Sequence, residues 1–149
     1  MRSANPYLNF PGDTEDVFSF YKSVFGGEFI LVVRYRDFPD NPMKVPEEDL
    51  DKVAHMALWL GENILMGTDA LASLGHEVTM GNNFFITLNP ESAEEADAVF
   101  NALSDGGSVE MPLTQTEWAE KYGMCTDKYG VQWMVSYEGS VKFDLGTKG

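Results

Sequence analysis

The same order of predicted elements occurs twice in this chain, and this repeat limits the fold more than any other feature of the sequence. A short apolar strand at 6–10 is followed by a helix, a Gly-Gly pair at 26–27 and three further strands. The series begins again with a strand at 84–88 and includes a second Gly-Gly pair at 106–107. Each series can form one sheet backed by one helix. The sequence therefore predicts two tandem βαβββ modules.

Apolar residues at helical spacing identify the helix of each module. Asp13 is the expected N-cap of the first helix, and the first Gly-Gly pair is its expected end. The second helix begins with a capping box formed by Ser92 and Glu95. Positions that correspond between the modules are Asn9 and Thr87, Phe18 and Ala96, Tyr21 and Val99, and Phe25 and Leu103.

The remaining strands complete an α+β fold. They are expected at 29–38, 53–60 and 64–69 in the first module and at 108–113, 124–127 and 131–138 in the second, with a short helical turn at 116–123. We expect one domain over 1–149, with module one at about 5–69, a connector at 70–82, module two at about 83–138 and a tail at 139–149. The open faces of the two sheets can curl around a shared cavity.

Charge and cysteine content restrict the partners and the compartment. The chain has 10 basic and 24 acidic residues, a formal charge of −14, which disfavours nucleic acid and anionic membranes. Arg34 and Arg36 alternate on one predicted strand and form either a local basic pocket or a solvated edge. The single cysteine, Cys125, excludes an internal disulfide and is expected to be a buried, inert thiol. With neither a signal peptide nor a membrane-spanning apolar run, the expected location is the cytoplasm.

Three segments resemble the PhnB-like branch of the vicinal-oxygen-chelate superfamily. They are PYLNF…FYKSVFGGEF, VAHMALWLGENILMGTD, and the second module from NNFFITL to GVQWMV. The resemblance implies a paired βαβββ fold and a homodimer. Some members of the superfamily are metalloenzymes, such as glyoxalase I and extradiol dioxygenases, whereas bleomycin-resistance proteins bind and sequester a ligand. Members of this branch often carry a 3-demethylubiquinone methyltransferase name, but no Gly-rich turn for a methyl-donor nucleotide is present here.

The same resemblance implies where a divalent metal would bind. The metal-binding relatives take ligands from the first and last strand of each module, and those positions here are Asn9, Met66, Thr87 and Met134. An amide, a hydroxyl and two thioethers are poor ligands for a hard or borderline cation. We therefore expect no cofactor. A divalent metal held by His55 and Glu138 is the alternative.

The expected ligand site combines these positions with nearby aromatic side chains. It consists of Asn9, His55, Met66, Thr87, Trp118, Tyr122 and Met134. Methionine and aromatic side chains favour a small apolar or aromatic ligand. His55 lies in an otherwise apolar strand and is either a structural histidine or a general base. The sequence thus predicts a small-molecule-binding protein, and the alternative is a glyoxalase- or dioxygenase-like enzyme that uses His55 as base or metal ligand on an oxygenated or aromatic metabolite.

Overall fold

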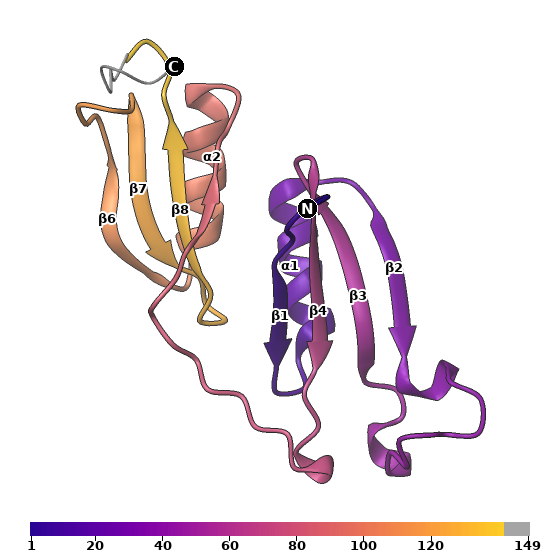
Figure 1. Cartoon of the computed structure of the whole chain (residues 1–149). Helices are drawn as coiled ribbons and strands as arrows, with labels where there is room; N and C mark the ends of the chain where they lie inside the picture. The colour runs from indigo at the N-terminus through magenta and orange to yellow at the C-terminus, as the bar shows by residue number, and fades with distance from the viewer. Residues whose placement is uncertain (142–149) are drawn as a thin grey trace. The chain divides into compact units, whose positions relative to one another are not determined.

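A computed structural model describes residues 1–141 and consists of two compact units, Met1–Thr79 and a second that starts at Met80. The boundary between the units lies inside the connector that the sequence predicts at 70–82. Each unit has one four-stranded mixed sheet and one α-helix (Figure 1). The fold is therefore α+β with two βαβββ modules, as predicted.

The first unit is built in the order β1 (Tyr7–Phe10), α1 (Thr14–Phe25), β2 (Phe29–Arg34), β3 (Val53–Leu60) and β4 (Asn63–Asp69). Its sheet has the strand order β1-β4-β3-β2, with β1 parallel to β4 and the other pairs antiparallel. The core between helix and sheet consists of apolar side chains, among them Leu8, Phe10, Val17, Phe18, Tyr21, Met56, Leu58 and Leu65.

The second unit repeats this arrangement with β5 (Ile86–Leu88), α2 (Ala93–Ser104), β6 (Ser108–Thr114), β7 (Lys121–Thr126) and β8 (Gln132–Tyr137). Its strand order is β5-β8-β7-β6, and β5 is parallel to β8. Its buried residues include Ala96, Phe100, Leu103, Cys125, Trp133 and Val135. Among residues 1–141 no helix is long and apolar enough to cross a membrane.

The N-terminal cap of α2 is the one predicted from the sequence, whereas the cap of α1 is not. Ser92 caps α2, because its Oγ accepts a hydrogen bond from the Glu95 N–H at 3.0 Å. Asp13 does not cap α1 with its side chain in the described part of the chain. Instead the carboxylate of Asp69, at the end of β4, accepts a hydrogen bond from the Thr14 N–H at 2.9 Å. The first helix therefore takes its cap from a strand that is distant in sequence.

Most strand bounds differ from the prediction by one or two residues, and β7 begins three residues before the predicted 124–127, but two predictions depart further. Strand β2 ends at Arg34 and passes into a 3₁₀ turn, η1 (Tyr35–Asp37), whereas the sequence predicts a strand to residue 38. The helical turn predicted at 116–123 is wrong. There the Thr116 hydroxyl accepts hydrogen bonds from the backbone N–H groups of Trp118 and Ala119, which makes a non-helical bend before β7. Two further 3₁₀ turns are η2 (Glu47–Asp49) and η3 (Ala72–Leu74).

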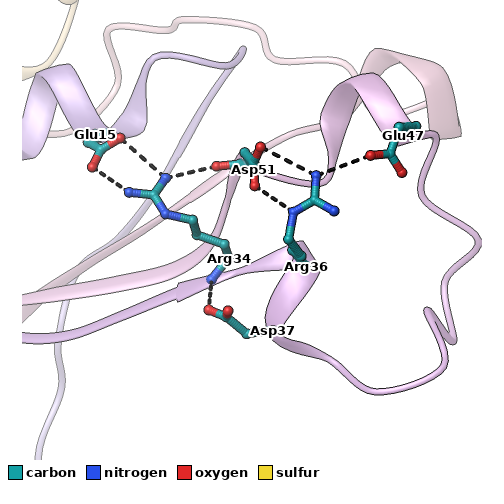
Figure 2. A network of polar contacts seen from close by, with 6 residues as sticks. All are labelled: Glu15, Arg34, Arg36, Asp37, Glu47 and Asp51. Carbon is teal, nitrogen blue, oxygen red and sulfur yellow. Dashed lines mark hydrogen bonds and ion pairs between the residues drawn. The ribbon is translucent and has the colours of Figure 1, made fainter.

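Arg34 and Arg36 belong to an ion-pair network at the end of β2 (Figure 2). The Arg34 guanidinium makes a bidentate pair with Glu15 of α1, at 2.6 and 3.3 Å, and also donates to the Asp51 carbonyl. Arg36 pairs with the Asp51 carboxylate at 2.7 Å and with Glu47 at 3.3 Å. Because carboxylates neutralise both guanidinium groups, these residues do not form the basic pocket that the sequence left open.

Candidate functional site

Each sheet has one face covered by its helix and a second face that points away from it. A side chain at Gly67 would place its Cβ 2.6 Å from the Phe18 ring of α1, so position 67 faces the helix. Met66 and Thr68 therefore point to the opposite side of the sheet, because side chains alternate along a strand. Register then places on the same face the residues Tyr7, Asn9, Leu31, Val33, His55 and Ala57. We call this surface the first open face.

The predicted residues Asn9, His55 and Met66 all lie on the first open face. Tyr7 is paired with Met66 and Asn9 with Thr68 across β1 and β4. His55 is the neighbour of Met56, which faces the helix opposite Gly67. Strand pairing thus places the three residues on one side of the sheet, which the sequence could indicate only within each strand.

The first open face carries a pair of polar aromatic side chains, Tyr7 and His55. The rings of Tyr7 and His55 are stacked, with centroids 5.6 Å apart and an interplanar angle of 29°. The Tyr7 hydroxyl lies 3.2 Å from Nδ1 of His55. Partial burial raises the pKa of Tyr7 above its usual value, so the phenol keeps its proton at neutral pH. The histidine is therefore held in place by a neutral hydrogen-bonding partner.

Tyr7 and Thr68, which also lie on the first open face, were not predicted from the sequence. Both residues could have been found from strand alternation, because Tyr7 is two residues before Asn9 and Thr68 is two residues after Met66. The contact between Tyr7 and His55 was harder to predict, since it joins β1 to β3, which are separated by β4 in the sheet.

The second unit has an equivalent surface, the second open face. A Cβ at Gly123 would lie 3.0 Å from the Phe100 ring of α2, so Tyr122 and Met124 point away from the helix. Register adds the row Thr87, Met134, Met124 and Met111, which runs across all four strands. This face is thus rich in methionine.

The four predicted residues of the second unit contact one another on this face. Met134 Sδ accepts a hydrogen bond from the Tyr122 hydroxyl at 3.1 Å and a longer contact from the Thr87 hydroxyl at 3.7 Å. The Trp118 ring meets Tyr122 edge to face, with centroids 5.3 Å apart. The hydroxyl groups are therefore directed to a thioether sulfur.

The donor groups of the described residues do not suit a divalent metal. The positions that the family resemblance assigns to ligands carry one amide, one hydroxyl and two thioethers, and the Thr87 hydroxyl is directed to Met134. Glu138 lies one residue beyond β8 and is exposed. Neither His55 nor Glu138 belongs to a group of three or more His, Cys, Asp or Glu side chains suited to a metal within residues 1–141.

Cys125 lies on the helix-facing side of β7 and is fully buried. Burial is the largest cause that raises the pKa of its thiol, from 9.0 to about 12, and the nearby Glu110 and Asp127 add to the effect. Since the thiolate is the reactive form, this geometry favours the inert thiol that the sequence predicts.

We expect the stability of the second unit to fall in alkaline solution because of Cys125. The unfolded thiol ionises near 9.0 and the folded one near 12, so the contribution is complete below pH 9 and is lost as the pH rises toward 12. At about pH 10.5 the loss is about 2 kcal/mol relative to pH 8. Urea unfolding of wild type and Cys125→Ala at both pH values measures it, and equal losses in the two proteins would contradict the prediction.

Comparison with known proteins gives consistent matches over nearly the whole chain. Residues 2–136 match the family described as 3-demethylubiquinone-9 3-methyltransferase. Protein YjdN of Escherichia coli (strain K12) is 28% identical over 142 residues, which cover 89% of this chain and 92% of that protein.

Solved structures agree with this match. Protein PA1353 from Pseudomonas aeruginosa is 37% identical, with a TM-score of 0.81 over 93% of this chain and 98% of that one. A putative 3-demethylubiquinone-9 3-methyltransferase, PhnB protein, from Bacillus cereus is 27% identical, with a TM-score of 0.72 over 91% and 99%. A glyoxalase-related enzyme from Fulvimarina pelagi, 19% identical with a TM-score of 0.59 over 97% and 99%, shows the glyoxalase-like fold alone.

Proposed function

This chain belongs to the PhnB-like family described as 3-demethylubiquinone-9 3-methyltransferase, which has the glyoxalase-like fold of the vicinal-oxygen-chelate superfamily, and on this premise we propose that it binds a small apolar or aromatic molecule without a divalent metal. The methyl-transfer chemistry in the family description is not part of the proposal. The β1–α1 turn, Pro11-Gly12-Asp13, lacks the repeated glycines that bring a nucleotide close to the backbone.

The main support for this proposal comes from the contacts of the Met134 sulfur. Metal-binding relatives place a carboxylate at the corresponding position, as the resemblance implies, and a thioether there is a poor ligand for Zn²⁺, Mn²⁺ or Mg²⁺. Its sulfur accepts the Tyr122 hydroxyl, while the Thr87 hydroxyl is directed to the same atom. The groups nearest this position therefore contact one another and leave an apolar, polarisable surface.

Exposed aromatic side chains support an apolar or aromatic ligand. Tyr7 and Trp59 on the first unit are 45% and 54% exposed, and Trp118 on the second is 44% exposed. When a flat apolar molecule covers large exposed aromatic side chains, the burial of apolar surface favours binding. An acidic chain with a charge of −14 would at the same time disfavour strongly anionic ligands.

A fluorescent titration with N-phenyl-1-naphthylamine tests the ligand class. We expect saturable binding to wild type, and binding at least about fivefold weaker in Met134→Lys, because the new ammonium group would have to be desolvated under an apolar ligand. Met43→Lys is the matched control, since Met43 is an exposed methionine in the loop after η1. Equal loss in both variants, or no saturable binding to wild type, would contradict the proposal.

We also propose that the protein is a cytoplasmic homodimer, as the family resemblance implies. Strand β2 lies at the edge of its sheet, and Ile30, Leu31 and Val32 are 43%, 45% and 38% exposed in succession. Residues 29–33 of this edge strand carry no charge, and an apolar edge of this kind is suited to contact with a second chain.

Native mass spectrometry on protein purified without chelator tests the metal and the dimer together. The expected species is a dimer whose mass includes no metal, and it should stay metal-free after incubation with Zn²⁺ or Mn²⁺. If a metal did bind with a micromolar Kd, a metal concentration 100 times the Kd would raise the free energy of unfolding by about 2.7 kcal/mol. A thermal melt would detect this increase. A stoichiometric metal would overturn the metal-free proposal, and a monomer would overturn the dimer.

A second candidate function is favoured by one observation, the Tyr7–His55 pair. A histidine oriented by a neighbouring hydroxyl is an arrangement that general bases use. In this alternative the protein is an enzyme acting on an oxygenated or aromatic metabolite. Turnover that is lost in His55→Ala, with circular dichroism unchanged, would favour the enzyme over the binding protein.

A further inference from the structure

We propose that three methionines on the second open face form a binding site for a soft monovalent metal ion, Cu(I) or its analogue Ag(I). We call them the methionine row, and they are Met111, Met124 and Met134. The row takes up the ion when it is supplied, with the three thioether sulfur atoms as ligands. This inference goes beyond the proposed function and does not depend on the apolar ligand.

The members of the methionine row lie side by side on three strands that are neighbours in the sheet (Figure 1). Met111 of β6 is paired with Met124 of β7, and Met124 is paired with Met134 of β8. Side chains that stand directly opposite each other on antiparallel strands share one face. Neighbouring strands are about 4.8 Å apart, and a methionine side chain has three rotatable bonds, so the outer two sulfur atoms can turn toward the central one. Three sulfur ligands can thus converge on one ion.

The sulfur of Met134 is held in a defined position at one end of the row. It accepts a hydrogen bond from the Tyr122 hydroxyl at 3.1 Å, and the Thr87 hydroxyl lies 3.7 Å from it. A thioether sulfur has two lone pairs, so the atom that accepts the Tyr122 proton keeps a second lone pair for a metal ion. All three methionines of the row are half-buried, which leaves them in reach of an ion from solvent.

A carboxylate on the same face favours a positive ion at the other end of the row. Thr126 is two residues after Met124 on β7 and therefore lies on the second open face. The Glu110 carboxylate accepts hydrogen bonds from the Thr126 hydroxyl at 2.6 Å and from the Ser108 hydroxyl at 3.1 Å. These contacts hold a negative charge on the face that carries the row, and the net charge of −14 adds to its attraction for cations.

The donor atoms determine which ion the row selects. Thioether sulfur is a soft, uncharged ligand that favours Cu(I), whereas Zn²⁺ favours imidazole and thiolate, and Mg²⁺ and Mn²⁺ favour oxygen. The chain has one thiol, Cys125, which is buried on the helix-facing side of β7 and does not compete for the ion. The same residue types that make this face poor for a hard divalent cation therefore suit a soft monovalent one.

Methionine methyl NMR with Ag(I) as the probe tests the location of the site. The chain has eight methionines, and single Met→Leu variants assign their ¹³C-labelled methyl signals. In a Cys125→Ala background, which removes the thiol, we expect Ag(I) to shift the signals of the methionine row and to leave those of Met43 and Met80 in place. Zn²⁺ should shift none of them. Shifts confined to methionines outside the row, or equal shifts with Zn²⁺, would overturn the proposal.

Competition with bicinchoninate, which forms a coloured complex with Cu(I), measures the affinity without oxygen present. We expect the Cys125→Ala protein to take Cu(I) from the complex, and Met124→Leu, which lacks the central ligand, to bind at least about tenfold more weakly. Leucine is close to methionine in volume, so the packing is kept. Met43→Leu, at an exposed methionine outside the row, is the matched control and should bind like its parent.

Two results would overturn the metal site. They are equal affinity for Cu(I) in the Met124→Leu and Met43→Leu variants, and no transfer of Cu(I) from bicinchoninate to the protein. Both leave the proposed function intact, because that function is measured separately by the binding of N-phenyl-1-naphthylamine to protein without metal.

Discussion

Replacement of Asp69 by alanine is expected to lower the free energy of unfolding of the first unit by about 3–5 kcal/mol. The side chain is 2% exposed and holds two backbone groups together. Its Oδ1 accepts the Thr14 N–H at the start of α1 at 2.9 Å, and its Oδ2 accepts the Val53 N–H at the start of β3 at 2.8 Å. Alanine would leave both N–H groups buried without a partner, and it would remove a negative charge from the positive end of the helix.

The measurement is urea unfolding together with hydrogen exchange resolved by residue. The increase in exchange should be greatest at the start of α1 and in β3. Asp37→Ala is the matched control, because Asp37 also accepts a backbone N–H, that of Arg34 at 2.8 Å, but is exposed. Its loss should stay below about 1 kcal/mol. Similar losses in the two variants would show that Asp69 does not anchor the helix and strand.

The contrast between Asp13 and Asp69 shows what a sequence pattern can predict here. The helix itself follows from the spacing of Val17, Phe18 and Tyr21, all of which are buried. The cap of the helix does not follow from this spacing. Asp13 is adjacent to the helix in sequence, but the capping residue is Asp69, which comes close to the helix only because β4 pairs with β1. Oδ1 of Asp13 is buried without a partner in the described residues. Local pattern thus predicted the helix, and a contact between distant residues determined its start.

On the open faces, too, some features could be predicted from the sequence and others depend on contacts between distant strands. The family resemblance implied that Thr87 and Met134 could face one site, and the register of β5 with β8 places them side by side. No alternation rule could predict that Tyr122 donates to the Met134 sulfur or that Tyr7 reaches His55, since these contacts depend on which strands are neighbours in the sheet. Likewise, the acidic partners of Arg34 and Arg36 come from α1, η2 and the segment before β3.

The bend at Thr116 is a local feature that the sequence pattern misassigned. Trp118, Ala119 and Glu120 are compatible with a helix, so the sequence predicted a helical turn at 116–123. The Thr116 hydroxyl accepts the N–H groups of Trp118 and Ala119, which offers the backbone an alternative to helical hydrogen bonds. This bend places the Trp118 ring next to that of Tyr122 on the second open face.

The second unit depends on a different buried carboxylate, and we expect Asp127→Asn to cost about 2–4 kcal/mol. The Asp127 side chain is 3% exposed. Its Oδ1 accepts the N–H groups of Tyr129 and Val131 at 2.8 and 3.1 Å, which shapes the turn between β7 and β8. Its Oδ2 accepts the indole N–H of Trp133 at 2.8 Å. An asparagine that keeps the turn contacts with its oxygen must direct its NH₂ group at the indole N–H, so two donors would face each other.

A double-mutant cycle with Trp133→Phe isolates this conflict. Phenylalanine has no ring N–H, so the cost of Asp127→Asn should be smaller in the Trp133→Phe background by at least about 1 kcal/mol, although Trp133→Phe is itself destabilising. Urea unfolding of the four proteins gives the coupling free energy. If the costs add to within about 0.5 kcal/mol, the indole contact contributes little and Asp127 acts through the turn alone. A clear coupling would instead show that Asp127 links the β7–β8 turn to the core, as Asp69 links α1 to β3 in the first unit.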